Sequence, residues 1–172
     1  MKIGIMGTHG TGKSTLALKL AAELKAQFPG ENVWLVPEIV RECPYPVNKD
    51  TSEIAQQWLW HMQFVRELEA QGRAEIVICD RTVLDSLAYA EFAGFITHAH
   101  DRIWDAVNWM ETYDTVYFLR PDSTSPIADD GFRSTDRDFQ MAIDQILARW
   151  VMEYPIKVIE RIGTGTTRTL EG

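Results

Sequence analysis

The sequence has little cysteine and no long hydrophobic run. Its 172 residues include two cysteines, Cys43 and Cys79, too few for a disulfide framework, which favours a reducing, cytoplasmic setting. No apolar stretch approaches the roughly 18 residues that a transmembrane helix needs. The N-terminal Met-Lys leads directly into a short apolar run, so we expect no signal peptide. These features predict a cytoplasmic protein without a membrane partner.

Blocks of lysine and arginine are also absent, and the net charge is −8. Proteins that bind polynucleotides normally carry a basic stripe, so this charge argues against a nucleic-acid partner. A local cluster of cations inside an acidic protein can still hold a small anionic ligand. The length is that of one domain large enough to bury most of its apolar surface, and we expect residues 1–172 to form a single domain.

The most informative stretch is residues 7–14, GTHGTGKS, which fits the phosphate-binding pattern G-x-x-x-x-G-K-[ST]. It follows an apolar run at residues 3–6 and precedes an amphipathic helical pattern. Backbone N–H groups of such a loop, and the positive end of the following helix, hold a phosphate chain. Lys13 would reach the β- and γ-phosphates, and the Ser14 hydroxyl would bind Mg²⁺. The predicted nucleotide-binding residues are Gly7, His9, Gly10, Thr11, Gly12, Lys13, Ser14 and Thr15.

Apolar runs of strand length alternate with helical patterns along the whole chain. The predicted strands cover residues 3–6, 33–36, 75–79, 115–119 and 156–159. Their apolar runs are continuous, which is typical of a parallel sheet covered on both faces. The sequence therefore predicts an α/β fold with three layers, helices on both sides of a central parallel five-stranded sheet.

The helical pattern that begins near Asp50 carries its large apolar residues on one face, which we expect to be buried. The residues of that face are Ile54, Trp58, Met62, Val65 and Leu68. Trp60 falls off this face, which leaves it as a candidate aromatic for contact with a substrate base.

Charged residues follow the predicted strands, where ligands gather in open α/β sheets. Glu38 and Arg41 come after the second strand, and Asp80, Arg81 and Asp85 come after the third. Asp80 has the setting of an acid that holds Mg²⁺, although it could also cap the next helix. Arg81 is placed to meet a substrate anion, the alternative being a solvated surface cation.

These residues resemble those of the P-loop nucleoside and nucleotide kinases, a group that includes thymidylate kinases, deoxynucleoside kinases and nicotinamide riboside kinases. The resemblance rests on the phosphate-binding loop, on Glu38 after Val36-Pro37, and on Asp80-Arg81 followed by Ala88-Tyr89. It implies a P-loop NTPase fold that uses ATP and Mg²⁺. Thymidylate kinases have a serine where Asp85 stands and an acid in the loop that is absent here, which disfavours dTMP as the acceptor.

The resemblance also implies roles for individual residues. Glu38 would accept the proton of a sugar hydroxyl, and Gln63 is similar in placement to a base-reading glutamine. A lid at about residues 120–138 would supply Arg133 and Arg137 to the transferring phosphoryl group, unless these arginines pair with nearby acids. Gly163, Thr164 and Gly165 resemble a turn that packs against adenine, although a frayed C-terminus explains them as well.

The predicted function is an ATP- and Mg²⁺-dependent kinase that transfers the γ-phosphoryl group to a small nucleoside-like acceptor. One alternative is a nucleoside monophosphate acceptor, whose phosphate Arg41 and Arg81 would grip. Another is a nucleotide-binding regulator or slow ATPase without a small-molecule acceptor. A homodimer is left open by the sequence.

Overall fold

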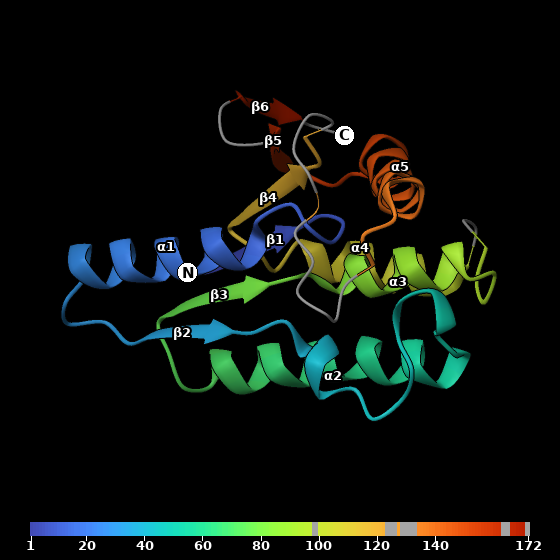
Figure 1. Cartoon of the computed structure of the whole chain (residues 1–172). Coiled ribbons are helices and arrows are strands. Elements are labelled where there is room, and N and C mark those ends of the chain that lie inside the picture. The colour runs from blue at the N-terminus through green and yellow to red at the C-terminus, as the bar shows by residue number, and fades with distance from the viewer. Residues whose placement is uncertain (98–99, 123–126, 128–133, 163–165, 171–172) are drawn as a thin grey trace.

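The computed structural model of the protein describes residues 1–97, 100–122, 127, 134–162 and 166–170 (Figure 1). Its sheet has the strand order β2-β3-β1-β4-β5-β6. The strands are β1 (Lys2–Met6), β2 (Val33–Val36), β3 (Ile76–Asp80), β4 (Thr115–Arg120), β5 (Val158–Ile162) and β6 (Thr166–Leu170). The first five strands in this order pair in parallel, which confirms the predicted five-stranded parallel sheet.

The C-terminal edge of the sheet differs from the sequence prediction. β5 begins at Val158, two residues later than predicted, and extends through the polar residues Glu160 and Arg161. β6 then pairs antiparallel with β5 as a sixth strand that the sequence did not predict. Glu160 fits in β5 because Arg120 of β4 donates a hydrogen bond to its carboxylate at 2.7 Å. Arg120 is distant in the sequence, so the local pattern of apolar residues does not indicate this bond.

Helices cover both faces of the sheet, as predicted (Figure 1). They are α1 (Lys13–Gln27), α2 (Glu53–Gln71), α3 (Val83–Phe92), α4 (Asp101–Met110) and α5 (Arg137–Glu153). α1 packs on one face, against a cluster that includes Ile5 and Ile78. The other helices contribute to a larger cluster on the opposite face, centred on residues such as Phe118 and Trp150. Among the described residues, no helix is long and apolar enough to cross a membrane.

α2 buries the face opposite to the one that its apolar residues predicted. Ile54 is 54 % exposed and Leu68 is 56 % exposed, whereas Gln63 and Glu67 are buried. The reason is a polar network around Glu67, whose carboxylate accepts hydrogen bonds from Tyr113 Oη at 2.5 Å and Trp109 Nε1 at 2.7 Å. Hydrogen bonds of this kind allow a charged residue to face the interior. The spacing of apolar residues along a helix does not predict them.

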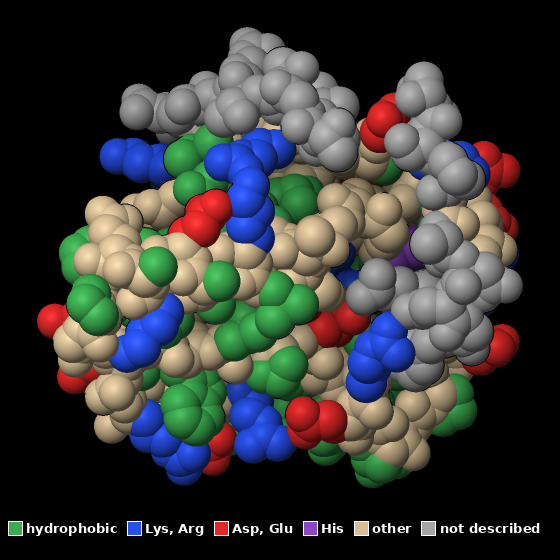
Figure 2. Space-filling model, turned by 60° about the vertical axis from the view of Figure 1, so that its left-hand side comes forward, with side chains coloured by type: hydrophobic (Ala, Val, Ile, Leu, Met, Phe, Trp, Pro, Cys, Tyr) green, Lys and Arg blue, Asp and Glu red, His purple; other side chains and the backbone are tan. Residues whose placement is uncertain are grey.

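On the face drawn in Figure 2, lysine and arginine side chains of the described residues lie among acidic ones. Those residues therefore form no basic stripe on this face.

Candidate active site

The phosphate-binding loop joins β1 to α1 and takes backbone conformations that favour glycine. Gly7 has a φ of 143°, and a Cβ at this position would lie 2.3 Å from the carbonyl oxygen of Leu119 in the neighbouring strand. Gly10 and Gly12 also have positive φ angles of 74° and 83°. Gly12 is the N-cap of α1, so the first turn of this helix, with its positive end, begins at Lys13.

Lys13 is buried inside this loop, where its Nζ donates to the carbonyl oxygen of Thr8 at 2.6 Å. Burial, and then the charge of Arg81, lower the pKa of Lys13 to about 7, against the opposing effect of Asp85 and two other acids. An ammonium group in such a place gains strongly from an anionic ligand, since the ligand would neutralise the charge that burial disfavours.

Ser14 and Asp80 line the same open depression next to the loop. Asp80 is only 4 % exposed, and its Oδ1 has no hydrogen-bond partner among the described residues. A buried carboxylate oxygen of this kind calls for a cation, and a carboxylate with a serine hydroxyl is the set of oxygen ligands that suits Mg²⁺. Within the described part of the chain, no group of three or more His, Cys, Asp or Glu side chains could hold a metal.

The alternative role of Asp80 as a helix cap is wrong. The N-cap of α3 is Thr82, whose backbone N–H and hydroxyl both donate to Asp85 Oδ2, at 2.8 and 2.9 Å. Asp85 Oδ1 also accepts from the backbone N–H of Gly7 at 3.0 Å. Asp85 is thus fully buried and ties α3 to the phosphate-binding loop, and it lines neither of the two hollows at the site. The expectation that Asp85 contacts a substrate is therefore not met.

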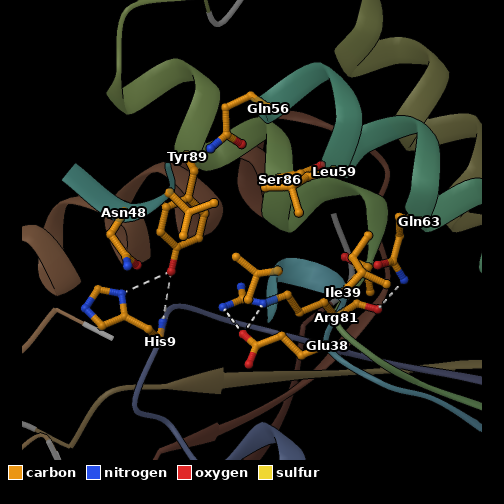
Figure 3. Close-up of a pocket in the computed structure, with 13 residues that line it drawn as sticks. His9, Glu38, Ile39, Asn48, Gln56, Leu59, Gln63, Arg81, Ser86 and Tyr89 are labelled. Atoms are coloured by element: carbon orange, nitrogen blue, oxygen red, sulfur yellow. Dashed lines mark hydrogen bonds and ion pairs between the residues drawn. The ribbon is translucent and has the colours of Figure 1, made fainter. Parts of the chain in front are cut away.

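Arg81 forms a buried ion pair with Glu38. Its Nε and Nη2 both lie 2.6 Å from Glu38 Oε1, and its Nη1 lies 3.4 Å from Asp85 Oδ1 (Figure 3). The guanidinium also lies 5.4 Å from the ring centroid of Tyr89. Burial opposes the charge, but Glu38 above all overcomes it and raises the pKa of Arg81, so the guanidinium stays charged. The alternative of a solvated surface cation is excluded by this burial.

A second hollow lies beyond Arg81, between the phosphate-binding loop, η1 (Ile39–Glu42), α2 and α3 (Figure 3). Its lining consists of His9, Glu38, Ile39, Val40, Val47, Asn48, Gln56, Leu59, Gln63, Arg81, Thr82, Ser86 and Tyr89. Glu38 lines both this cavity and the depression lined by Ser14 and Asp80, so the two hollows adjoin at this residue. We call this second hollow the acceptor cavity.

A family model described as an AAA domain matches residues 2–168. The chain belongs to this family. The match covers nearly the whole chain and includes the phosphate-binding loop, Glu38 and Asp80. The sequence matches no curated protein.

Solved structures of kinases share the fold of this AAA domain. Thymidylate kinase from Ehrlichia chaffeensis aligns with a TM-score of 0.66 and 20 % identity, over 99 % of this chain and 91 % of the kinase. Deoxyadenosine kinase from M. mycoides with bound dATP aligns with a TM-score of 0.59 and 20 % identity, over 94 % and 89 % of the two chains. The same enzyme with bound dCTP aligns at 0.58 and 21 %, over 93 % and 90 %. These alignments confirm the fold of P-loop nucleoside and nucleotide kinases.

The structure brings only part of the predicted substrate set to the acceptor cavity. Glu38, Gln63 and Arg81 line it, but Arg41 lines the neighbouring depression and is exposed. Trp60 belongs to the buried core and packs edge-on against the ring of Phe64. The expectation that Trp60 contacts a base is therefore wrong, because Trp60 lies on the face of α2 that packs into the core.

The predicted lid and the predicted adenine turn fall largely outside the described residues, including Arg133, Gly163, Thr164 and Gly165. Arg137 is described, at the start of α5. Its Nη1 donates to Gln140 Oε1 at 2.7 Å and to the carbonyl oxygen of Asp122 at 3.2 Å. Gln140 Nε2 in turn donates to the carbonyl oxygen of His9 at 2.7 Å, which connects α5 to the phosphate-binding loop.

Sequence reasoning missed several residues of the site. Tyr89 accepts a hydrogen bond from the backbone N–H of His9 at 3.2 Å, and its hydroxyl lies 3.0 Å from His9 Nδ1. Ser86 and Gln56 complete the wall of the acceptor cavity. The spacing of Thr82, Ser86 and Tyr89 could have indicated this face of α3, since positions three and four apart share one side of a helix.

Proposed function

We propose that this protein is an ATP- and Mg²⁺-dependent kinase that transfers the γ-phosphoryl group to a hydroxyl of a small nucleoside-like acceptor. The observation that carries the proposal is the position of Glu38, where the acceptor cavity adjoins the depression lined by Ser14 and Asp80. A phosphoryl group held in the depression and a hydroxyl held in the cavity would come together at this carboxylate. The solved structures that share the fold are those of a thymidylate kinase and a deoxyadenosine kinase, which supports the same class of reaction.

The residues divide the work of this transfer. The acceptor hydroxyl oxygen bonds to the γ-phosphorus, the bond from this phosphorus to the bridging oxygen of ADP breaks, and Glu38 takes the hydroxyl proton. Arg81 holds Glu38 in place through the 2.6 Å ion pair. Lys13 exchanges its hydrogen bond with Thr8 for one with the phosphate oxygens, where its charge stabilises the transition state.

Ser14 and Asp80 would hold Mg²⁺, because their oxygens line one depression and Asp80 Oδ1 has no other described partner. When bound, Mg²⁺ neutralises charge on the phosphate oxygens. The phosphate-binding loop, Lys13, Ser14 and Asp80 then bind the nucleotide, while the acceptor cavity binds the second substrate.

The cavity favours a nucleoside-like acceptor over a nucleoside monophosphate. Glu38 and Arg81 neutralise each other in their ion pair, so the pair offers no net positive charge to a second phosphate. Arg81, the one Lys or Arg side chain in the described lining, is already paired with Glu38. A regulator or slow ATPase without an acceptor gives no reason for a partly apolar cavity beside the phosphate-binding loop.

The test is ADP formation by the full chain with ATP and Mg²⁺, with and without a pool of nucleosides, nucleoside monophosphates and nicotinamide riboside. We expect a nucleoside to stimulate ADP formation and to gain one phosphoryl group, detected by mass spectrometry. Lys13→Ala is the control, and it should abolish the product while leaving the melting temperature of the nucleotide-free protein nearly unchanged. ADP formation that no acceptor stimulates would support the regulator or slow ATPase instead.

A further inference from the structure

Gln140 lies near the start of α5 and bridges this helix to the phosphate-binding loop. It is only 1 % exposed. Its Oε1 accepts a hydrogen bond from Arg137 Nη1 at 2.7 Å, and its Nε2 donates to the carbonyl oxygen of His9 at 2.7 Å. A guanidinium has no acceptor and a backbone carbonyl has no hydrogen to donate, so these two partners fix the orientation of the Gln140 amide.

The phosphate-binding loop is held at His9 from two sides. The His9 N–H donates to Tyr89 Oη of α3 at 3.2 Å, while Gln140 of α5 bonds to the His9 carbonyl oxygen. The backbone and the amide approach closely here, since a Cβ at Gly10 would lie 3.0 Å from Gln140 Nε2. Because the backbone of such a loop holds the phosphates, a side chain that is bonded to this backbone keeps a fixed position relative to them.

Arg137 receives its position from the same bridge. Its Nη1 donates to Gln140 Oε1 and to the carbonyl oxygen of Asp122, two residues after the end of β4. A guanidinium is planar, so two bonds at one nitrogen set the plane in which its other N–H groups point. Two hydrogen bonds in series thus join the partly buried Arg137 to the carbonyl of His9. A cation in this place stabilises the negative charge that develops on a transferring phosphoryl group.

We infer that Gln140 is a positioning residue, which docks the Arg137 guanidinium on the phosphate-binding loop in the geometry that phosphoryl transfer needs. This inference rests on the proposed function for the action of Arg137 on the γ-phosphoryl group. Gln140 itself lines neither the acceptor cavity nor the depression lined by Ser14 and Asp80, so its effect passes through Arg137. Loss of the bridge leaves Arg137 charged but misplaced, and a misplacement of about 1 Å is enough to slow a reaction about 100-fold.

Gln140→Met tests the bridge, because methionine has a similar length and can make neither hydrogen bond. ADP formation by the full chain is measured with varied ATP, saturating Mg²⁺ and the nucleoside that gains a phosphoryl group in the pool assay. We expect kcat to fall about 10- to 100-fold while KM for ATP changes about 3-fold or less. Gln145→Met is the matched control, since it makes the same change at an exposed position of α5, and it should leave kcat unchanged. The melting temperature reports folding, and an unchanged kcat in folded Gln140→Met would overturn the inference.

A double-variant cycle shows whether Gln140 acts through Arg137. Arg137→Met removes the cation and should lower kcat about 100-fold or more. If Gln140 only places this cation, the addition of Gln140→Met to Arg137→Met should cost about 3-fold or less in kcat. Losses that multiply in the double variant would mean that Gln140 acts by another route, such as the packing of α5, and would overturn the inference.

Fluoroaluminate provides a measurement without turnover. Bound beside ADP and Mg²⁺, this planar anion imitates the transferring phosphoryl group. Calorimetry on the full chain should show that Gln140→Met weakens binding of ADP with fluoroaluminate about 10-fold or more, and binding of ADP alone about 3-fold or less. Equal losses for the two ligands would overturn the role of Gln140.

The inference and the proposed function therefore fail separately. An affinity for fluoroaluminate that depends on Gln140, without any phosphorylated nucleoside, would contradict the nucleoside kinase and support the role of Gln140. Phosphorylation of a nucleoside that proceeds unchanged in Gln140→Met would support the kinase and overturn the role of Gln140.

Discussion

Arg81 adopts a backbone conformation that is unusual for a residue with a Cβ. Its φ is 113°, in a region that costs energy outside glycine. Interactions on three sides hold it there: its N–H donates to the carbonyl oxygen of Ile5 at 3.1 Å, Gln63 donates to its carbonyl oxygen, and Glu38 pairs with its guanidinium. The strained turn directly after β3 directs the side chain into the site, so the strain is part of how the site is built.

At this residue scale, the role of Glu38 predicts the kinetics of two variants. Glu38→Gln keeps the shape of the side chain but cannot take a proton, so kcat with a nucleoside acceptor should fall about 100-fold or more, with a smaller change in acceptor KM. Arg41→Ala should be milder, because Arg41 lies in the depression and not in the acceptor cavity. Steady-state kinetics with varied acceptor measure both. The reverse ranking, with a steep rise of acceptor KM in Arg41→Ala, would favour a monophosphate acceptor.

The lowered pKa of Lys13 predicts proton uptake on nucleotide binding. With a pKa of about 7 in the empty protein, Lys13 is mostly neutral at pH 8.5 and mostly charged at pH 6. A bound triphosphate favours the charged form, so binding at pH 8.5 should take up about one proton, and binding at pH 6 should take up little. Calorimetry of a non-hydrolysable ATP analogue in buffers of different ionisation enthalpy measures the uptake.

The lowered pKa of Lys13 also predicts how the free energy of unfolding depends on pH. The folded pKa of Lys13 lies below that of the unfolded chain, so between pH 7 and about 10.5 the unfolded state binds more protons. The cost of burying the Lys13 charge is therefore full below pH 7 and falls as the pH rises through that window. Lys13→Ala is the control for both effects, and proton uptake that persists in this variant would assign the titration to another group.

At the scale of elements, the orientation of α2 is open to a direct test. Leu59 is 7 % exposed and Leu68 is 56 % exposed, although the apolar pattern of the helix favours the reverse. Leu59→Ala should lower the free energy of unfolding by about 2 kcal/mol or more, whereas Leu68→Ala should change it by about 0.5 kcal/mol or less. Urea denaturation compares the two, which share the same chemical change in the same helix. A larger loss in Leu68→Ala would mean that α2 packs by its apolar face after all.

At the scale of the whole molecule, Arg120 joins three elements. From the end of β4 it donates to Asp144 of α5, with its Nη2 2.5 Å from Oδ2, and to Glu160 of β5 at 2.7 Å. Arg120→Met would leave two carboxylates without their counter-charge, of which Asp144 is almost fully buried. We expect a loss on the order of 3 kcal/mol in the free energy of unfolding at pH 7.

The pH dependence of this loss follows from Asp144. Burial raises the pKa of Asp144 even with Arg120 present, and removing the arginine raises it further. A carboxyl group whose pKa is higher in the folded than in the unfolded state lowers the free energy of unfolding as the pH increases. The loss of unfolding free energy in Arg120→Met should therefore shrink from pH 7 to pH 5. Arg66→Met is the matched control, because its ion pairs with Glu42 and Glu69 are exposed and are worth about 1 kcal/mol or less. Equal losses in the two variants would contradict a structural role for Arg120.

The sequence by itself determined the fold class and the location of the site. The glycines and Lys13 of the phosphate-binding loop act through local backbone geometry, which a short motif specifies. Continuous apolar runs specify buried parallel strands, and the carboxyl ends of those strands bring Glu38, Asp80 and Arg81 to one edge of the sheet. Their proposed roles in phosphoryl transfer stay predictions.

Only the tertiary structure decided which polar side chains face inward. Glu67 is buried because its partners come from β1, α4 and the turn after α4, far away in the sequence, and this turns α2 so that Trp60 enters the core. Asp85 supports the phosphate-binding loop for a similar reason, through the N–H of Gly7. Apolar periodicity counts hydrophobic residues along one helix, whereas a buried polar group is stabilised by hydrogen bonds to distant segments, which exist only once the chain has folded.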